Sequence, residues 1–231
     1  MIHVQGLAKY FGRFSALRDL RISVPQGQFI ALFGRNGAGK TTFLKILAGL
    51  SRPSSGTVTI QGAKPGSQSA RGMIGYLSHN TALYLDLTAL ENLRFYARLL
   101  DHSSSDVDLE ARIAHVGLAG RGHEPVRNYS RGMQQRLAIA RAFLHDPAIL
   151  LLDEPFTGLD QEGTNFLRDY LSASRARGKS CVMAIHDEPL GYALADRLVV
   201  IEKGITALDF SPQSVSLEDF QHRYHALTEE R

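Results

Sequence analysis

A glycine-rich loop near the N-terminal end carries the most specific chemistry in the chain. Residues 34–41 read Gly-Arg-Asn-Gly-Ala-Gly-Lys-Thr and match the pattern Gly, four residues, Gly-Lys-Ser/Thr at every fixed position. Glycines let successive backbone N–H groups point at phosphate oxygens, which a Cβ atom would obstruct. Lys40 would add a mobile positive charge, and the Thr41 hydroxyl a hard oxygen for Mg²⁺. The pattern therefore predicts a nucleoside triphosphate site. Its residues are Gly34, Arg35, Asn36, Gly37, Ala38, Gly39, Lys40, Thr41 and Thr42.

A second element pairs an apolar run with two carboxylates. Residues 148–155 read Ala-Ile-Leu-Leu-Leu-Asp-Glu-Pro, which indicates a strand that ends in a Walker B motif. Adjacent strand residues point to opposite faces, so we expect the two acids to have different roles. Asp153 directly ends the apolar run and is the expected metal partner. Glu154 is then the expected general base that orients and deprotonates water.

His186 ends the next predicted strand, residues 180–185. Ligands of open parallel sheets lie beyond the carboxyl ends of the strands. We therefore expect the imidazole to emerge beside Glu154, where it could sense the γ-phosphate.

Residues 129–136, Tyr-Ser-Arg-Gly-Met-Gln-Gln-Arg, predict a second helix N-terminus suited to an anion. A chain with one triphosphate loop has no evident need of another such site. The exception is a helix end that serves a nucleotide bound by a second copy.

The pattern of apolar and polar residues around these motifs predicts the strands and helices that position them. Apolar residues between Ile2 and Thr59 suit short strands, and a helix beginning near Lys40 should close on Gly49. Residues 88–144 have helical texture and open with a capping box at Thr88. Later strands alternate with helices, which is typical of a parallel α/β sheet. A last helix, capped at residues 216–219, should pack onto the core through Phe220, Tyr224 and Leu227.

Composition excludes several classes of protein. The chain has 231 residues and 44% apolar content, enough for a sizeable core. Apolar runs such as residues 148–152 are far shorter than the roughly 20 residues of a membrane span. No signal peptide is visible at the start, so we expect a cytoplasmic location. The net charge of +3 comes without a dense basic run, so no nucleic acid partner is expected. The single cysteine, Cys181, lies in a strand-like run and is expected to be buried.

These motifs, in this order, resemble those of the ATP-binding subunits of ABC transporters, from the N-terminal strands to about Ile205. The resemblance implies an α/β P-loop NTPase fold with a parallel-sheet core, a small antiparallel β subdomain and an inserted α-helical subdomain. Residues 1–231 would form a single ATP-binding domain. The helical insertion would span approximately residues 84–145, and a C-terminal extension approximately residues 206–231.

The resemblance also implies partners. Two copies would form a head-to-tail dimer that holds two ATP molecules with Mg²⁺, each between the phosphate loop of one chain and the signature of the other. The signature residues here would be Ser130, Arg131, Gly132, Met133 and Gln134, and Asp160 would belong to the D-loop. Phe11, just before Gly12, would stack on adenine. Integral membrane subunits would hold the ATPase peripherally at the cytoplasmic face of the membrane, and Tyr84, Phe95 and Tyr96 are candidate contacts with them.

Two departures from the family pattern bear on turnover. The usual signature is Leu-Ser-Gly-Gly-Gln, of which this chain retains Ser130 and Gly132, the two residues implied to contact the γ-phosphate. Where the family has a Gln that reaches Mg²⁺ and the water, this chain has either His79 or Asn80, depending on alignment. Asn has the shorter reach of the two.

Within the family, the Ser-Arg-Gly-Met signature and residues 87–96 most resemble exporter ATPases. The greatest likeness is to the haem-exporter ATPase of cytochrome c maturation. Multidrug and polysaccharide exporters share many of the same sequence motifs. The cargo of such transporters is chosen by their membrane subunits. The alternatives are a soluble, non-transport ABC ATPase and a nucleotide-binding module that no longer hydrolyses. Glu154 and His186 argue against the last of these.

Overall fold

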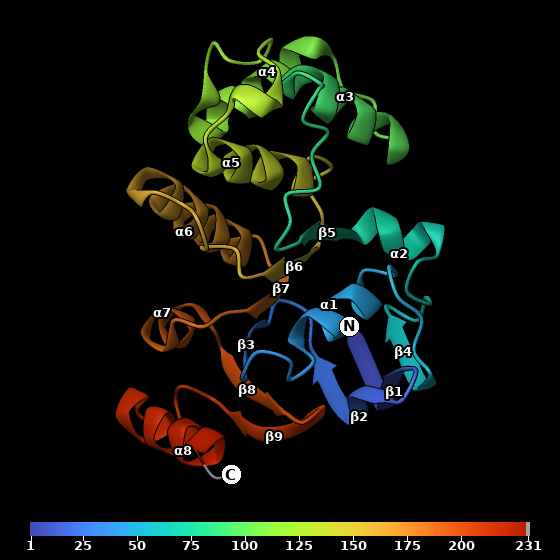
Figure 1. Cartoon of the computed structure of the whole chain (residues 1–231), viewed down its shortest axis with the longest axis vertical. Coiled ribbons are helices and arrows are strands. Elements are labelled where there is room, and N and C mark those ends of the chain that lie inside the picture. The colour runs from blue at the N-terminus through green and yellow to red at the C-terminus, as the bar shows by residue number, and fades with distance from the viewer. Residues whose placement is uncertain (230–231) are drawn as a thin grey trace.

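Two β-sheets organise the chain in the computed structural model, which describes residues 1–229 (Figure 1). The smaller sheet is antiparallel and has the order β2-β1-β4, formed by β1 (Ile2–Phe11), β2 (Phe14–Val24) and β4 (Ser55–Ile60). The larger sheet has the order β5-β6-β7-β3-β8-β9 and is parallel except for its last strand. Its strands are β3 (Phe29–Phe33), β5 (Ile74–Leu77), β6 (Ile149–Asp153), β7 (Ser180–Ala184), β8 (Arg197–Glu202) and β9 (Ile205–Phe210).

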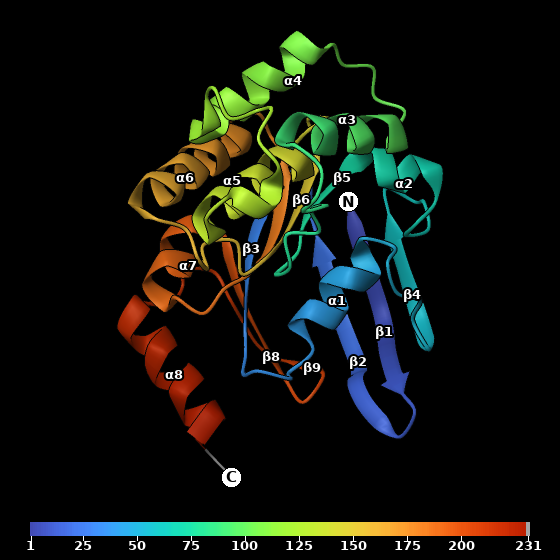
Figure 2. The same cartoon turned by 45° about the horizontal axis from the view of Figure 1, so that its top comes forward.

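The helices divide between the two faces of the larger sheet and an insertion at one end (Figures 1 and 2). The α-helices are α1 (Lys40–Leu47), α2 (Gln68–Met73), α3 (Ala89–Leu99), α4 (Asp106–Ile113), α5 (Arg131–Ala142), α6 (Gln161–Ala176), α7 (Glu188–Leu194) and α8 (Leu217–Glu229). Two short turns, a π-type turn over Ala114–Leu118 and a 3₁₀ turn over Val126–Asn128, lie between α4 and α5. The predicted α/β class, with a parallel core, an antiparallel subdomain and helices, is confirmed.

Strand alternation explains why the larger sheet is apolar on both faces. In β3, Ile30 and Leu32 pack with α1 and the small sheet, whereas Ala31 and Phe33 pack with α5, α6 and α8. Neighbouring side chains of a strand point to opposite faces, so a sheet covered on both sides needs a continuous apolar run. Cys181 in β7 is buried in the same way, as expected, and burial raises the pKa of its thiol.

The insertion has a core of its own, built from α3, α4, the turns and one side of α5. The Thr88 capping box is present: its hydroxyl accepts from the Glu91 N–H, and the Glu91 carboxylate accepts from the Thr88 N–H. The structure therefore confirms the predicted start of the first insertion helix.

One local expectation was wrong. The N-terminal strands β1 and β2 are not short, because they form a hairpin of 10 and 11 residues. The first residues of the predicted C-terminal extension, 206–210, form a strand. They lie in β9, which pairs antiparallel with β8 and closes one edge of the larger sheet. This pairing joins neighbouring strands through a two-residue turn, which a local apolar pattern does not specify.

Helix α8 packs on the core, as predicted. The Phe220 side chain is fully buried, and its ring centroid lies 5.0 Å from that of Phe33, the last residue of β3. Tyr224 stacks on Phe220 at 6.0 Å. The predicted cap is also present, with the Asp219 N–H donating to the Ser216 hydroxyl at 3.1 Å.

Among residues 1–229, we find no helix whose length and apolar character would let it cross a bilayer.

The packing of α8 generates a stability prediction. Replacing Phe220→Ala should lower the free energy of unfolding by about 3 kcal/mol, because a fully buried aromatic ring leaves a cavity between α8 and β3. Urea unfolding followed by circular dichroism measures the change. The control is Leu99→Ala, since Leu99 is 66% exposed. A loss for Phe220→Ala no larger than that of the control would show that α8 does not unfold with the core.

Candidate functional site

The glycine-rich loop joins β3 to α1 in a backbone shape that requires glycine. Gly39 has φ +111°, and a Cβ atom there would lie 2.6 Å from the Ala16 carbonyl oxygen. Lys40, only 6% exposed, lies inside the loop, where Nζ donates to the Gly34 carbonyl at 2.6 Å and the Arg35 carbonyl at 3.3 Å. The loop thus surrounds a positive charge with backbone that can turn its N–H groups inward.

Thr41 and Asp153 meet at the base of this loop. The Thr41 hydroxyl donates to Asp153 Oδ1 at 3.0 Å. The second oxygen, Oδ2, is buried and has no hydrogen-bond partner among residues 1–229. A buried acceptor without a partner is costly, and carboxylate and hydroxyl oxygens are ligands that Mg²⁺ prefers. The two residues therefore fit a magnesium ion between them.

Burial and charge act in opposite directions on these groups. Burial lowers the pKa of Lys40, while the charges of Glu154 and Asp153 raise it. Burial raises the pKa of Asp153, opposed by the Thr41 hydrogen bond and by His79 and Lys40. Both carboxylates therefore act on the same lysine.

Glu154 lies between two imidazoles. Its Oε1 is 2.7 Å from His186 Nε2, and its Oε2 is 3.4 Å from His79 Nδ1. The side chain is 22% exposed, so water can reach it. We expected Asp153 and Glu154 to differ in role because adjacent residues of a strand point to opposite faces. That reason was wrong, because β6 ends at Asp153 and Glu154 lies outside the strand. Glu154 follows with φ +53°, a left-handed conformation that turns its side chain toward the loop.

The two alternatives for the unusual Gln position are placed differently. His79 is the residue that approaches Glu154. Asn80 is exposed, and its backbone carbonyl accepts from the Ser78 hydroxyl. The structure therefore brings His79 into the cluster of Lys40, Asp153 and Glu154.

A hollow of about 170 Å³ lies over the loop and contains Glu154 in its wall. Phe11 and Phe14, at the end of the β1–β2 hairpin, form its apolar side and are 54% and 61% exposed. Exposed rings beside a phosphate-binding loop can stack on a base. Sequence reasoning singled out Phe11 and missed Phe14, although both residues flank the Gly12 turn.

The predicted signature segment, residues 130–134, lies elsewhere. Ser130 caps α5, with its hydroxyl accepting from the Met133 N–H at 3.3 Å. None of residues 130–134 lines the hollow over the loop, and α5 lies well apart from α1 in Figure 1. The start of α5 therefore does not face the nucleotide loop of its own chain.

The Asp160 side chain links α5 to α6 through hydrogen bonds. Its Oδ1 caps α6 by accepting from the Gly163 N–H at 2.8 Å, and its Oδ2 accepts from Arg136 at 3.0 Å. Arg136 is nearly buried and also binds Glu162 at 3.2 Å. Sequence reasoning did not single out Arg136, whose partners lie 24 and 26 residues away.

The chain matches the family model described as ABC transporter over residues 17–157. It is 36% identical to the uncharacterized ABC transporter ATP-binding protein YdbJ of Bacillus subtilis, covering 92% of this chain and 70% of the relative. It is 34% identical to the Nod factor export ATP-binding protein I of Rhizobium johnstonii, over 93% of this chain and 70% of the relative. It is 33% identical to the sulfate/thiosulfate import ATP-binding protein CysA of Pectobacterium atrosepticum, over 93% of this chain and 67% of the relative.

Solved structures agree with the sequence relatives. An ATP-binding subunit of an ABC transporter superposes with a TM-score of 0.89 and 26% identity, over 99% of both chains. A dimeric post-hydrolysis state of the ATP-binding cassette MJ0796, bound to ADP and Pi, superposes with a TM-score of 0.83 and 25% identity, over 92% of this chain and 99% of that one. Together with the glycine-rich loop and the two carboxylates at the end of β6, these matches show that the chain belongs to the ABC transporter family, as an ATP-binding subunit that hydrolyses ATP.

Proposed function

We propose that two copies of this chain form a head-to-tail dimer in which each ATP lies between the loop of one copy and the α5 N-terminus of the other. The observation that supports the proposal is that the N-terminus of α5 lies apart from the loop of its own chain. Glu154 lines the same hollow as the loop, whereas residues 130–134 do not. A capped helix start with free N–H groups favours an anion, and a second copy would supply one. The dimeric MJ0796 cassettes support this arrangement by similarity.

In this site, Glu154 acts as the general base. Its carboxylate accepts a proton from water as the water oxygen bonds to the γ-phosphorus and the bond to the ADP oxygen breaks. His186 and His79 fix the two carboxylate oxygens and so orient the base. Thr41 and Asp153 would hold Mg²⁺, which stabilises negative charge on the phosphate oxygens when bound. Phe11 and Phe14 would stack on adenine.

ATP turnover would drive a separate membrane partner that docks on the helical insertion, residues 84–145. Tyr84, Phe95 and Tyr96 form an aromatic cluster with ring centroids 5.0 to 6.3 Å apart. Tyr84 and Phe95 are 50% and 41% exposed, and Leu99 beside them is also exposed. Exposed aromatic groups of this kind suit a protein interface. Such docking would place the chain peripherally at the cytoplasmic face of the membrane.

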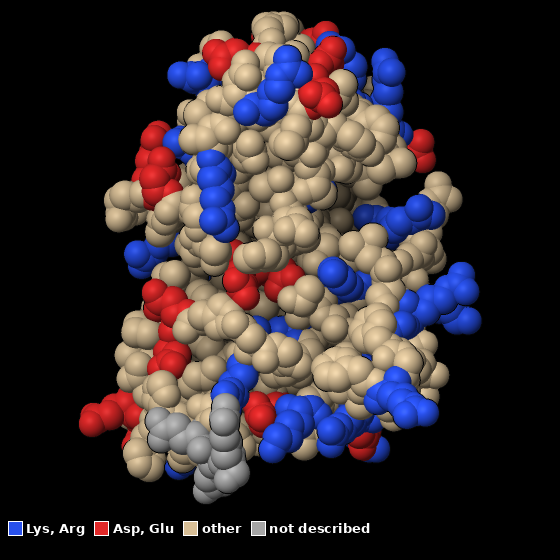
Figure 3. Space-filling view, viewed as in Figure 1, with Lys and Arg blue, Asp and Glu red and all other residues tan. Residues whose placement is uncertain are grey.

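Export is the direction we favour, with haem for cytochrome c maturation as one cargo hypothesis. Its support is the Ser-Arg-Gly-Met signature and residues 87–96. The relatives include both an exporter and an importer at nearly equal identity, so they favour no cargo. Figure 3 shows both signs of charge on this face, with Lys and Arg gathered toward the lower right and Asp and Glu more frequent on the left.

The proposed base gives a first test. Glu154→Gln should retain ATP binding and lower turnover by about a hundredfold or more, because the amide cannot accept the proton. It should also favour the ATP-bound dimer. Phosphate release and size-exclusion chromatography with ATP measure both effects. Glu110→Gln is the matched control, since Glu110 lies on the exposed side of α4. Turnover that equals the control would exclude Glu154 as the base.

The head-to-tail arrangement predicts complementation between two inactive variants. Lys40→Ala should lose ATP affinity by about tenfold or more. Gly132→Asp should fold, because an acid suits the first turn of a helix, yet repel the partner's triphosphate. A 1:1 mixture would contain heterodimers with one intact site and should recover up to about a quarter of native turnover.

The control for that mixture is Gly72→Asp, because a side chain at Gly72 would meet open space. Gly72→Asp alone should keep native turnover. A mixture of Lys40→Ala and Gly132→Asp that stays as inactive as each variant alone would contradict the shared site.

The membrane partner can be captured with ATP present. Tagged Glu154→Gln chain, purified in mild detergent, should carry a multi-span membrane protein in stoichiometric amount. A Phe95→Ala, Tyr84→Ala double change should reduce its recovery severalfold, because it removes exposed apolar contact area. Mass spectrometry identifies the companion, and components of cytochrome c maturation among the companions would support haem export. Recovery with ribosomal or assembly proteins, and no membrane protein, would instead favour the soluble ATPase.

A further inference from the structure

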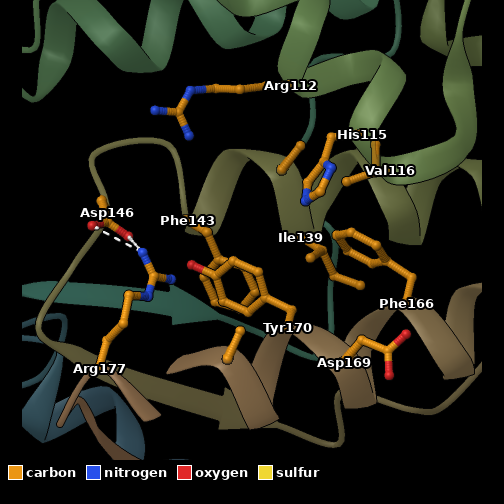
Figure 4. Close-up of a pocket in the computed structure, with 12 residues that line it drawn as sticks. Arg112, His115, Val116, Ile139, Phe143, Asp146, Phe166, Asp169, Tyr170 and Arg177 are labelled. Carbon is orange, nitrogen blue, oxygen red and sulfur yellow. Dashed lines mark hydrogen bonds and ion pairs between the residues drawn. The ribbon is translucent and has the colours of Figure 1, made fainter. Parts of the chain in front are cut away.

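A hollow of about 650 Å³ lies between the 114–118 turn, the end of α5 and the middle of α6 (Figure 4). It is several times larger than the hollow over the nucleotide loop and shares no lining residue with it. Its volume falls in the range of small-molecule sites, about 300 to 1,000 Å³. The hollow has no role in the ATP chemistry described above.

The floor of the hollow is aromatic. Phe143 and Tyr170 stack with ring centroids 4.2 Å apart and an interplanar angle of 1°. Phe166 lies beside them and meets the His115 ring edge-on at 5.3 Å. Figure 4 shows His115 pointing from the turn toward these rings. Flat apolar surfaces of this kind recognise a flat aromatic ring.

The rim carries its positive charge on one side. Arg112 extends over the opening from α4 in Figure 4, and within residues 1–229 its guanidinium has no hydrogen bond or ion pair. The Arg177 guanidinium is already engaged by Asp146 at 3.3 Å, and Lys179 also binds Asp146. Asp169 lies on α6, away from Arg112 (Figure 4). An acidic group of a bound molecule would therefore lie next to Arg112.

We propose that this hollow binds a small planar aromatic anion, with the ring over Tyr170 and Phe166 and the acidic group at Arg112.

The wall of the hollow leads to the signature helix. Val116 lines the hollow, and the next residue, Gly117, has φ +74°. A Cβ atom at Gly117 would lie 2.7 Å from Arg136 Nη1, so the turn rests directly on that guanidinium. Arg136 in turn binds Asp160, which caps α6. A molecule that displaces the 114–118 turn would therefore shift the link between α5 and the D-loop. This step rests on the proposed function and predicts slower ATP turnover.

Binding can be measured with a matched pair of dyes, 8-anilinonaphthalene-1-sulfonate and its uncharged analogue N-phenyl-1-naphthylamine. The chain contains no tryptophan, so dye fluorescence has no tryptophan background. We expect one sulfonate dye per native chain. Arg112→Ala should weaken the sulfonate dye about five- to tenfold and leave the uncharged dye unchanged. Ala173→Phe, which fills the hollow from α6, should weaken both dyes.

Arg98→Ala is the matched control, because Arg98 is exposed on α3, outside the hollow. Equal sulfonate affinity in the Arg112 and Arg98 variants would overturn the anion site. Unchanged binding of both dyes to Ala173→Phe would overturn the hollow itself as the site. Circular dichroism melting of each variant checks that it is folded.

Turnover tests the coupling separately. Saturating sulfonate dye should slow ATP turnover by native chain and slow it far less in Arg112→Ala, whose own turnover should be near native. Binding that follows the predicted variant pattern without any effect on turnover would overturn the coupling and leave the binding site standing. Loss of turnover in Glu154→Gln is independent of both results, so a failure here is distinguishable from a failure of the proposed function.

Discussion

Parallel pairing of β6, β7 and β3 is the constraint on which the site depends. Asp153 pairs with Ala184, and Ala184 pairs with Leu32, so the three strands end at one level. The chain segments that follow carry Glu154, His186 and the phosphate loop. Because the side-chain period in a strand is two, a shift of one residue would exchange the side chains that pack on the two covered faces of the sheet. The packing that fixes the register of these strands therefore also fixes the distances between Glu154, His186 and the loop.

The site is held by charges that water barely reaches. Lys40 and Asp153 are 6% and 1% exposed, and burial alone disfavours the charged form of each. Each supplies the opposite charge that the other needs, and Thr41 adds a hydrogen bond. Removing one member of such a set leaves an uncompensated buried charge. Lys40 and Asp153 therefore contribute to the folding of the loop region, in addition to the roles proposed for them in nucleotide binding.

The sequence predicted the features that depend on neighbouring residues and missed those that depend on tertiary contacts. The loop, the strand that ends at Asp153 and the Thr88 capping box are set by neighbouring residues, and local patterns found them. The left-handed turn at Glu154 is stabilised by tertiary contacts, including its N–H bond to the Ala184 carbonyl, so strand alternation misjudged it.

Features formed by distant segments were beyond local patterns. The edge strand β9 depends on pairing with β8, and Arg136 depends on acids more than 20 residues along the chain. Phe14 gains its place beside the loop from the hairpin, not from its own neighbours. The sequence does not predict a cargo either, because the exposed aromatic cluster on the insertion indicates a surface for a partner and not a transported molecule.

Helix α5 connects these parts because it belongs to two cores at once. Ala138 and Ile139 pack with the larger sheet, whereas Leu137 and Ala140 pack inside the insertion. A helix anchored on both sides moves as a rigid body, and close-packed cores transmit small shifts. Near its start, the Gln135 amide donates to the carbonyl of Pro155, the residue after Glu154, at 3.4 Å. In the proposed dimer, a phosphate bound at the start of α5 would therefore act on the partner's nucleotide, on the insertion and on its own chain's base through the same helix.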